Sequence, residues 1–175
     1  YRDTPGNASS IHSYGQAARQ RLEAARRQVA AHLNARPDEI VFTSGGTEAN
    51  NLALFGLVQP GAPGHFITQA TEHPAVLNVV EELRRLGESV TIIPVDSGGL
   101  ADPGDIQRAI LPNTRAISVM AVNNETGVIQ PLAEIGRICR EKKVFFHTDA
   151  AQAAGKIPLD VEALNIDLMS ISGHK

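Results

Sequence analysis

The sequence is poor in several features, and each shortage excludes a class of protein. The 175 residues hold one cysteine, Cys139, so no disulfide can form within the chain. This fits a reducing compartment, and we expect a cytoplasmic protein. No apolar run approaches the roughly 20 residues that span a bilayer, and no signal peptide is visible at the start. The net charge of −3 predicts no broad basic surface, so we expect neither nucleic acid nor a membrane as a partner.

The composition is that of an ordinary globular domain. Hydrophobic residues make up 42% of the chain and charged residues 20%, and 175 residues are enough for one domain with a sizeable core. We find no internal repeat, low-complexity segment or domain boundary. The chain opens at Tyr1 without a methionine and stops at Lys175, which leads us to expect a piece of a longer protein.

Strand and helix patterns alternate along the chain after a polar loop at residues 1–10. Helices are predicted at residues 15–34, 47–58, 74–86, 103–111, 131–143 and 161–164. Strands are predicted at residues 39–43, 65–69, 89–95, 115–122, 144–147 and 168–171. Ser9, Ser10 or Ser13 is expected to cap the first helix. Because the strands are continuous apolar runs, the predicted fold class is α/β, a predominantly parallel sheet flanked by helices.

The last predicted strand leads into a small polar turn that ends in Lys175. Open parallel sheets bind ligands just past the carboxyl ends of their strands. A lysine that is partly desolvated there can lose its proton near neutral pH and attack a carbonyl to form a Schiff base. From this stretch alone, a surface lysine that follows a strand is an equally simple interpretation.

A glycine-containing turn at residues 44–48 joins a predicted strand to a predicted helix. Glycines let the backbone approach a ligand, and the first N–H groups of a helix attract an anion. Thr47 adds a hydroxyl group to this turn. The pattern favours a phosphate-binding turn, although a plain capped turn has the same composition, and it is neither a Walker loop nor a dinucleotide fingerprint.

Two further polar clusters follow predicted strands. In the first, at residues 71–74, His73 has a flat ring that can stack on a heteroaromatic ring or move a proton, or it simply caps the next helix. In the second, at residues 123–127, the amide side chains bind a ring oxygen or a carboxylate, or they bond their own loop.

A carboxylate, Asp149, follows the predicted strand at residues 144–147. An unpaired carboxylate beyond a buried strand is costly, so a cationic partner is expected. A protonated pyridine nitrogen suits this role, because a carboxylate there keeps the ring an electron sink. A structural ion pair is the alternative. His147 is predicted to pack in the core beside the site.

These clusters become specific when they are taken together. They supply a phosphate cradle, a ring-stacking side chain, hydrogen-bonding amides, a carboxylate and an amine, all at the carboxyl ends of strands. One ligand uses all five, and it is pyridoxal 5′-phosphate (PLP). No metal site is predicted.

Six stretches, spread along nearly the whole chain, carry a resemblance to a known family. They are NASSIH at 7–12, SGGTEANN at 44–51, TEHPAV at 71–76, VNNETG at 122–127, HTDAAQ at 147–152 and SISGHK at 170–175. In composition and order they resemble NifS/IscS-type cysteine desulfurases, which are class-V aminotransferase-like PLP enzymes. The resemblance implies that residues 1–175 belong to the PLP-binding large domain of fold type I, and that the enzyme is a homodimer.

The resemblance also implies a role for each matching residue. Lys175 would hold PLP covalently, and His73 would stack on the ring and help to move protons. Asp149 would pair with the pyridine nitrogen and Gln152 with the phenolic oxygen, while Asn124 would face the substrate. The phosphate would be held by Gly46, Thr47, Ser172 and His174. The implied reaction converts L-cysteine to L-alanine and passes persulfide sulfur to a scaffold or other acceptor protein for iron–sulfur cluster assembly.

The resemblance stops short of the sulfur-handling residues. In the family, the sulfur-accepting cysteine and the carboxylate-binding arginine lie downstream of the PLP lysine. The first strand, the rest of the large domain and a C-terminal small domain are also expected to be missing. Cys139 is not a substitute, because it shares a helical face with Leu132, Ile135 and Gly136 and is predicted to be buried. We therefore expect the cofactor machinery without desulfurase activity in this chain alone.

Two other functions are compatible with the same motifs. A selenocysteine lyase or a related PLP-dependent aminotransferase would keep the cofactor and change the substrate. A catalytically inactive PLP-fold scaffold is a different class of function. The intact Lys175, Asp149 and His73 disfavour the scaffold, since a decayed site is expected to lose one of them.

Overall fold

The computed structural model describes residues 6–175, and the chain divides into two compact units. The first unit is Tyr1–Phe42 and the second is Thr43–Lys175. The first five residues of the predicted N-terminal loop lie outside the described residues. That both units belong to one large domain stays a prediction.

The first unit is built around the helix α1 (Ser13–Leu33), followed by a short 3₁₀ helix, η1 (Pro37–Glu39). The helix is capped by His12, whose Nδ1 accepts a hydrogen bond of 3.2 Å from the N–H of Gly15. The predicted serine cap is therefore wrong. Ser13 is already the first helical residue, so the acceptor has to come from the residue before it.

The predicted strand at residues 39–43 is also wrong. Glu39 ends η1, and residues 40–43 pair with no strand in the described part of the chain. The apolar side chains of this run are open to solvent, with Val41 64% and Phe42 47% exposed. Arg26 donates to the carbonyl of Ile40, and its guanidinium lies 5.0 Å from the centre of the Phe42 ring. A β-prone run without a neighbouring strand has no ladder to join.

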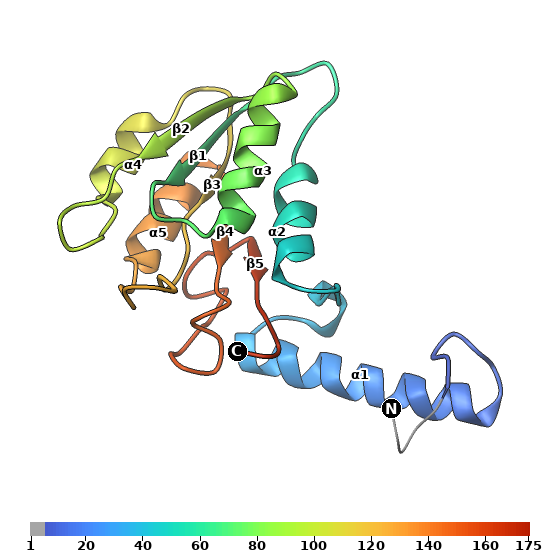
Figure 1. Cartoon of the computed structure of the whole chain (residues 1–175). Helices are drawn as coiled ribbons and strands as arrows, with labels where there is room; N and C mark the ends of the chain where they lie inside the picture. The colour runs from blue at the N-terminus through green and yellow to red at the C-terminus, as the bar shows by residue number, and fades with distance from the viewer. Residues whose placement is uncertain (1–5) are drawn as a thin grey trace. The chain divides into compact units, whose positions relative to one another are not determined.

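The second unit contains a five-stranded sheet in which every neighbouring pair is parallel. Its strands lie in the order β2-β1-β3-β4-β5 (Figure 1). Their bounds are β1 His65–Gln69, β2 Ser89–Ile93, β3 Thr114–Ser118, β4 Phe145–Asp149 and β5 Leu168–Ser170. The predicted parallel α/β fold is confirmed.

Four helices pack on this sheet, in two pairs (Figure 1). One pair is α2 (Gly46–Phe55) and α3 (Pro74–Arg85), and the other is α4 (Pro103–Ala109) and α5 (Leu132–Lys142). Beneath α2 and α3 lies a core whose burial stabilises the unit by about 25 cal/mol per Å² of apolar surface. Its buried members are Leu54, Phe66, Val76, Val79, Val80, Leu83 and Ala116.

The predicted helix at residues 161–164 is a series of turns instead. Asp160 Oδ1 accepts the N–H of Ala163 at 2.9 Å, and Asn165 takes a positive φ of 51°. The Asp160 bond caps the start of a helical turn, and the left-handed Asn165 ends it after that single turn.

The strands are less apolar than the sequence pattern suggested, because their middle and last positions bury polar side chains. His147 in β4 is fully buried between two hydroxyl groups, with Nδ1 2.8 Å from Ser118 Oγ and Nε2 3.2 Å from Ser170 Oγ. Burial lowers the pKa of His147 to about 4, so the ring is neutral at pH 7. The prediction that His147 packs in the core is confirmed. No helix among residues 6–175 is both long and apolar enough to cross a membrane.

Candidate functional site

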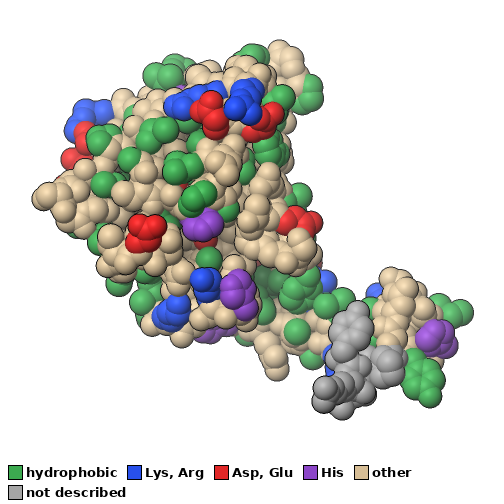
Figure 2. Space-filling view, viewed as in Figure 1, with side chains coloured by type: hydrophobic (Ala, Val, Ile, Leu, Met, Phe, Trp, Pro, Cys, Tyr) green, Lys and Arg blue, Asp and Glu red, His purple; other side chains and the backbone are tan. Residues whose placement is uncertain are grey.

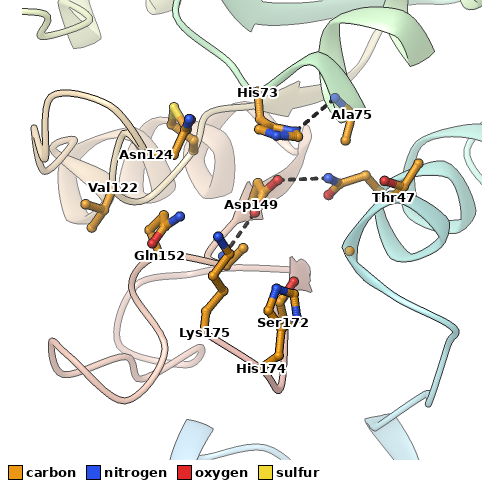
Figure 3. Close-up of a pocket in the computed structure, with 14 residues that line it drawn as sticks. Thr47, His73, Ala75, Val122, Asn124, Asp149, Gln152, Ser172, His174 and Lys175 are labelled. Atoms are coloured by element: carbon orange, nitrogen blue, oxygen red, sulfur yellow. Dashed lines mark hydrogen bonds between the residues drawn. The ribbon is translucent and has the colours of Figure 1, made fainter.

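A cavity of about 360 Å³ lies where the ends of several elements of the second unit meet. It opens at the carboxyl ends of β1, β4 and β5 and beside the first turn of α2 (Figure 3). The sequence-predicted site residues all line it. They are Gly46, Thr47, His73, Asn124, Asp149, Gln152, Ser172, His174 and Lys175.

The charge around this unit is mixed rather than of one sign. On the face shown in Figure 2, Lys and Arg side chains form small groups, several of them beside acidic side chains. Arg84 pairs with Glu81 and Arg85 with Glu82, each at 3.2 Å on the exposed side of α3. Pairs of this kind contribute little to stability. The distinctive chemistry of the unit therefore lies in the cavity.

The first turn of α2 approaches the turn after β5 closely enough to form a narrow polar cradle. A Cβ atom on Gly46 would lie only 2.9 Å from Ser172 Oγ, so a larger side chain at position 46 would crowd the hydroxyl. The first intrahelical bond runs from the N–H of Ala49 to Gly45, which leaves the preceding N–H groups for another acceptor. Since no strand precedes this turn, the anion-binding geometry comes from the helix end alone.

His73 both caps a helix and lines the cavity. Its Nδ1 accepts a hydrogen bond of 3.1 Å from the N–H of Ala75, which makes His73 the N-cap of α3. A neutral ring that accepts through Nδ1 carries its proton on Nε2. The capping interpretation is therefore confirmed, and the stacking or proton-moving role at the cavity stays a prediction.

The two neighbouring asparagines after β3 differ in their surroundings. Asn123 Oδ1 accepts from the N–H groups of Glu125 and Thr126, and its Nδ2 donates to the carbonyl of Thr71 at 2.9 Å. Asn123 thus holds the loop in place. Asn124 is left to face the cavity (Figure 3).

Asp149 is held by hydrogen bonds and has no cationic partner among residues 6–175. It is 7% exposed; Oδ2 accepts from Asn50 Nδ2 at 2.8 Å, and Oδ1 accepts from the N–H of Ala151 at 3.0 Å (Figure 3). The structural ion pair considered from the sequence is not formed here. A buried carboxylate held in this way is well placed to meet a cationic group of a ligand.

Asn50 is the site residue that the sequence reasoning missed. It is fully buried on α2, lines the cavity and orients Asp149, and its own Oδ1 has no hydrogen-bond partner in the described structure. Its spacing was informative, because residues three and four apart in a helix share a face. Asn50 follows Gly46 by four positions and Thr47 by three, so it had to face the same space.

Lys175 reaches the cavity from the turn after β5. Figure 3 shows its side chain directed from that turn toward Asp149 and Gln152. Gln152 Oε1 accepts from Lys156 Nζ at 3.1 Å on the outer side. The arrangement brings an amine, a buried carboxylate and a helix-end anion site to one cavity.

Cys139 takes no part in this site. It is 1% exposed on α5, and burial raises the pKa of its thiol to about 12. The prediction of a buried, unreactive cysteine is confirmed, because the thiolate is the nucleophilic form.

Comparison with known sequences places these residues in a family context. The model of the aminotransferase class-V family matches residues 1–175. The chain is 53% identical over 169 residues to a cysteine desulfurase of Homo sapiens, covering 95% of this chain and 37% of the relative. It is 53% identical to a mitochondrial cysteine desulfurase of Candida albicans, covering 95% and 35%. The chain thus spans a little over a third of the length of these relatives.

Solved structures of related proteins also match this chain. SspA in complex with cysteine matches with a TM-score of 0.93 at 40% identity, over 98% of this chain and 50% of that one. A NifS-like protein matches with a TM-score of 0.95 at 38% identity, over 99% and 49%. A C-DES variant with glycine covalently linked to its PLP cofactor matches with a TM-score of 0.82 at 27% identity, over 94% and 44%.

Proposed function

This chain belongs to the class-V aminotransferase family, and on that basis we propose that it carries the cofactor site of a PLP-dependent cysteine desulfurase. The single observation that supports this most strongly is the meeting of Lys175 and Asp149 at one cavity with a helix-end anion site. The cavity volume of about 360 Å³ lies in the range of small-molecule sites.

The residues present fit PLP by their donor chemistry. The first N–H groups of α2 and the Ser172 hydroxyl lie side by side and suit a phosphate group, and a Cβ atom on Gly46 would crowd that hydroxyl. Asp149 offers a carboxylate that is fixed by Asn50 and Ala151 and lacks a cation in the described chain. When bound, PLP supplies an electron sink for charge that develops next to the substrate nitrogen.

Each side chain then has a proposed task. Lys175 anchors the cofactor through its amine, and Asp149 holds a proton at the ring nitrogen. His73 would lie against the cofactor ring and help to move protons, while Gln152 and Asn124 would donate hydrogen bonds to the oxygen side of the ring. Thr47, His174, Gly46 and Ser172 bind the phosphate.

The sulfur-accepting group has to come from outside these residues. Cys139 is buried and its pKa is raised to about 12, which removes it as a nucleophile. The relatives are nearly three times as long as the matched region. We infer that the rest of the protein supplies a reactive cysteine and the group that binds the substrate carboxylate.

The wider biological setting belongs to the same proposal. We propose L-cysteine as the substrate, a homodimer as the working form, and transfer of sulfur to a scaffold or other acceptor protein that serves iron–sulfur cluster assembly. We propose that the protein acts in the cytoplasm. Because the relative in Candida albicans is mitochondrial, cell fractionation is the experiment that tests this compartment.

The test is a visible absorption spectrum of the whole purified protein before and after L-cysteine, with sulfide assayed alongside. A yellow protein whose band shifts and which releases sulfide is the expected result. A yellow protein that ignores cysteine but responds to selenocysteine or another amino acid would move the function to a related PLP enzyme. A protein that stays colourless after incubation with PLP would overturn the proposal.

A further inference from the structure

One buried acid next to the cavity has no role in the proposed chemistry. Glu72 directly precedes His73 and is 4% exposed, yet it enters no ion pair among residues 6–175. Its Oε2 is one of the few buried polar atoms there without a hydrogen-bond partner. A buried carboxyl group without a cation is expensive, so its presence calls for a physical reason.

The contacts of Glu72 join two segments that each carry cavity residues. Its Oε1 accepts a hydrogen bond from the backbone N–H of Met120, two residues beyond β3. The residue before it, Thr71, accepts from Asn123 Nδ2 at 2.9 Å. These two bonds tie the segment after β1, which carries His73, to the segment after β3, which carries Met120 and Asn124.

The charge state of Glu72 suits a structural tie. Burial raises the pKa of Glu72 to about 8; the hydrogen bond from Met120 and the nearby Gln69 amide oppose this shift, and the charge of Asp149 adds a smaller contribution to it. The Glu72 carboxyl group is therefore mostly protonated at pH 7. A neutral carboxyl group still accepts one backbone hydrogen bond without needing a counter-ion.

We propose that Glu72 is a positioning residue of this site, an acid that fixes the segment after β3 against His73 by accepting the N–H of Met120. The choice of PLP as the ligand rests on the proposed function, whereas the contact between Glu72 and Met120 is observed in the structure. Removing the acceptor leaves the Met120 N–H buried and unpaired, which loosens a wall of the cavity.

The chain offers a matched control in Glu88. It is also buried, at 7% exposed, and its Oε2 also accepts a backbone N–H, that of Gly64, but it precedes β2 at the opposite end of the sheet. The experiment compares Glu72→Ala, Glu72→Gln and Glu88→Ala in the whole protein. The readouts are amide hydrogen exchange of the peptide containing Met120 without cofactor, and the PLP dissociation constant from a fluorescence titration.

Glu72→Ala is expected to speed exchange at Met120 and to weaken PLP binding, each by roughly tenfold. Glu72→Gln keeps the acceptor and should restore both values to within about twofold of the parent, and Glu88→Ala should change neither. Loss of protection in Glu72→Gln, or equal effects of the two alanine variants, would overturn the proposal. Should Glu72→Ala not fold, Glu72→Leu fills the space without an acceptor and takes its place. A parent protein that binds no PLP would contradict the proposed function, while the exchange data would still decide the tie.

Discussion

The amino and carboxyl ends of the parallel strands differ in how many of their buried polar side chains have hydrogen-bond partners. At the amino end, His65 places Nδ1 2.8 Å from Thr114 Oγ1 and Nε2 2.8 Å from Thr91 Oγ1, so one ring joins three strands. Glu88 is likewise occupied by the N–H of Gly64. These hydrogen bonds between strands stabilise the sheet.

At the carboxyl end, several buried side-chain atoms have no hydrogen-bond partner in the described chain. In the described chain, six buried side-chain atoms lack a hydrogen-bond partner, and five of them lie in or just beyond the last positions of strands or on the facing turn of α2. These five are Asn50 Oδ1, Thr68 Oγ1, Gln69 Nε2, Glu72 Oε2 and Thr148 Oγ1. The sixth, Arg115 Nε, belongs to the amino end. Since an unsatisfied buried group costs about 1–3 kcal/mol, we expect the carboxyl end to contribute less to the stability of the unit than the amino end.

The largest expected effect is the loss of the covalent link at the carboxyl end. Lys175→Ala removes the amine that the structure directs into the cavity, so borohydride should no longer fix PLP to the protein. Mass spectrometry after reduction measures this directly. Continued fixation would place the link on another residue and remove Lys175 from its role.

Asp149→Ala should separate cofactor binding from chemistry. The phosphate cradle and Lys175 remain, so PLP still binds, but the carboxylate that holds the ring proton is gone and turnover should fall roughly 100-fold. Steady-state sulfide release by the whole enzyme is the measurement. Near-normal turnover would show that the buried carboxylate is structural after all.

A pair of substitutions tests the contrast between the two ends. His65→Ala leaves two threonine hydroxyls and a cavity, so the free energy of unfolding should drop by about 3 kcal/mol with PLP affinity unchanged. Asn50→Ala should weaken PLP binding roughly tenfold, because Asp149 loses a donor. Urea unfolding and PLP titration of both variants give the four values. If both variants change stability and PLP affinity to the same extent, the proposed difference between the two ends of the sheet is wrong.

The stability of the unit should also carry a pH dependence from Glu72. Its pKa in the fold is raised to about 8, from an ordinary value of 4.5, so the unfolded chain releases this proton first as pH rises. The free energy of unfolding should therefore fall between about pH 4.5 and pH 8 and level off above that range. Subtracting the Glu72→Gln profile isolates this slope, and a flat difference would show that Glu72 is ionised throughout.

The smallest effect is expected at Cys139. Cys139→Ser should leave sulfide release within about twofold of the parent, because a buried thiol with a pKa of about 12 does not act as a nucleophile. An iodoacetamide assay on the folded protein provides an independent check. An inactive variant that is still folded would mean that the helix opens during turnover.

Much of the fold followed from the sequence because its patterns are local. The alternation of apolar runs with helical periods predicted the five parallel strands, and the strand at His65–Gln69 was placed without error. The failures came where a local pattern lacked a tertiary partner. Residues 39–43 have strand composition but no strand beside them in the described chain, and residues 161–164 have a helical pattern that the left-handed Asn165 ends after one turn.

By itself the sequence predicted which residues line the cavity, because phosphate cradles, carboxylates and amines need particular side chains at particular strand and helix ends. Only the tertiary structure decided how those residues are held. Asn50 and Asp149 are 99 positions apart and meet at 2.8 Å, and Glu72 reaches Met120 across 48 positions. Such bonds depend on which helix covers which strand, and the packing of the whole unit sets that arrangement.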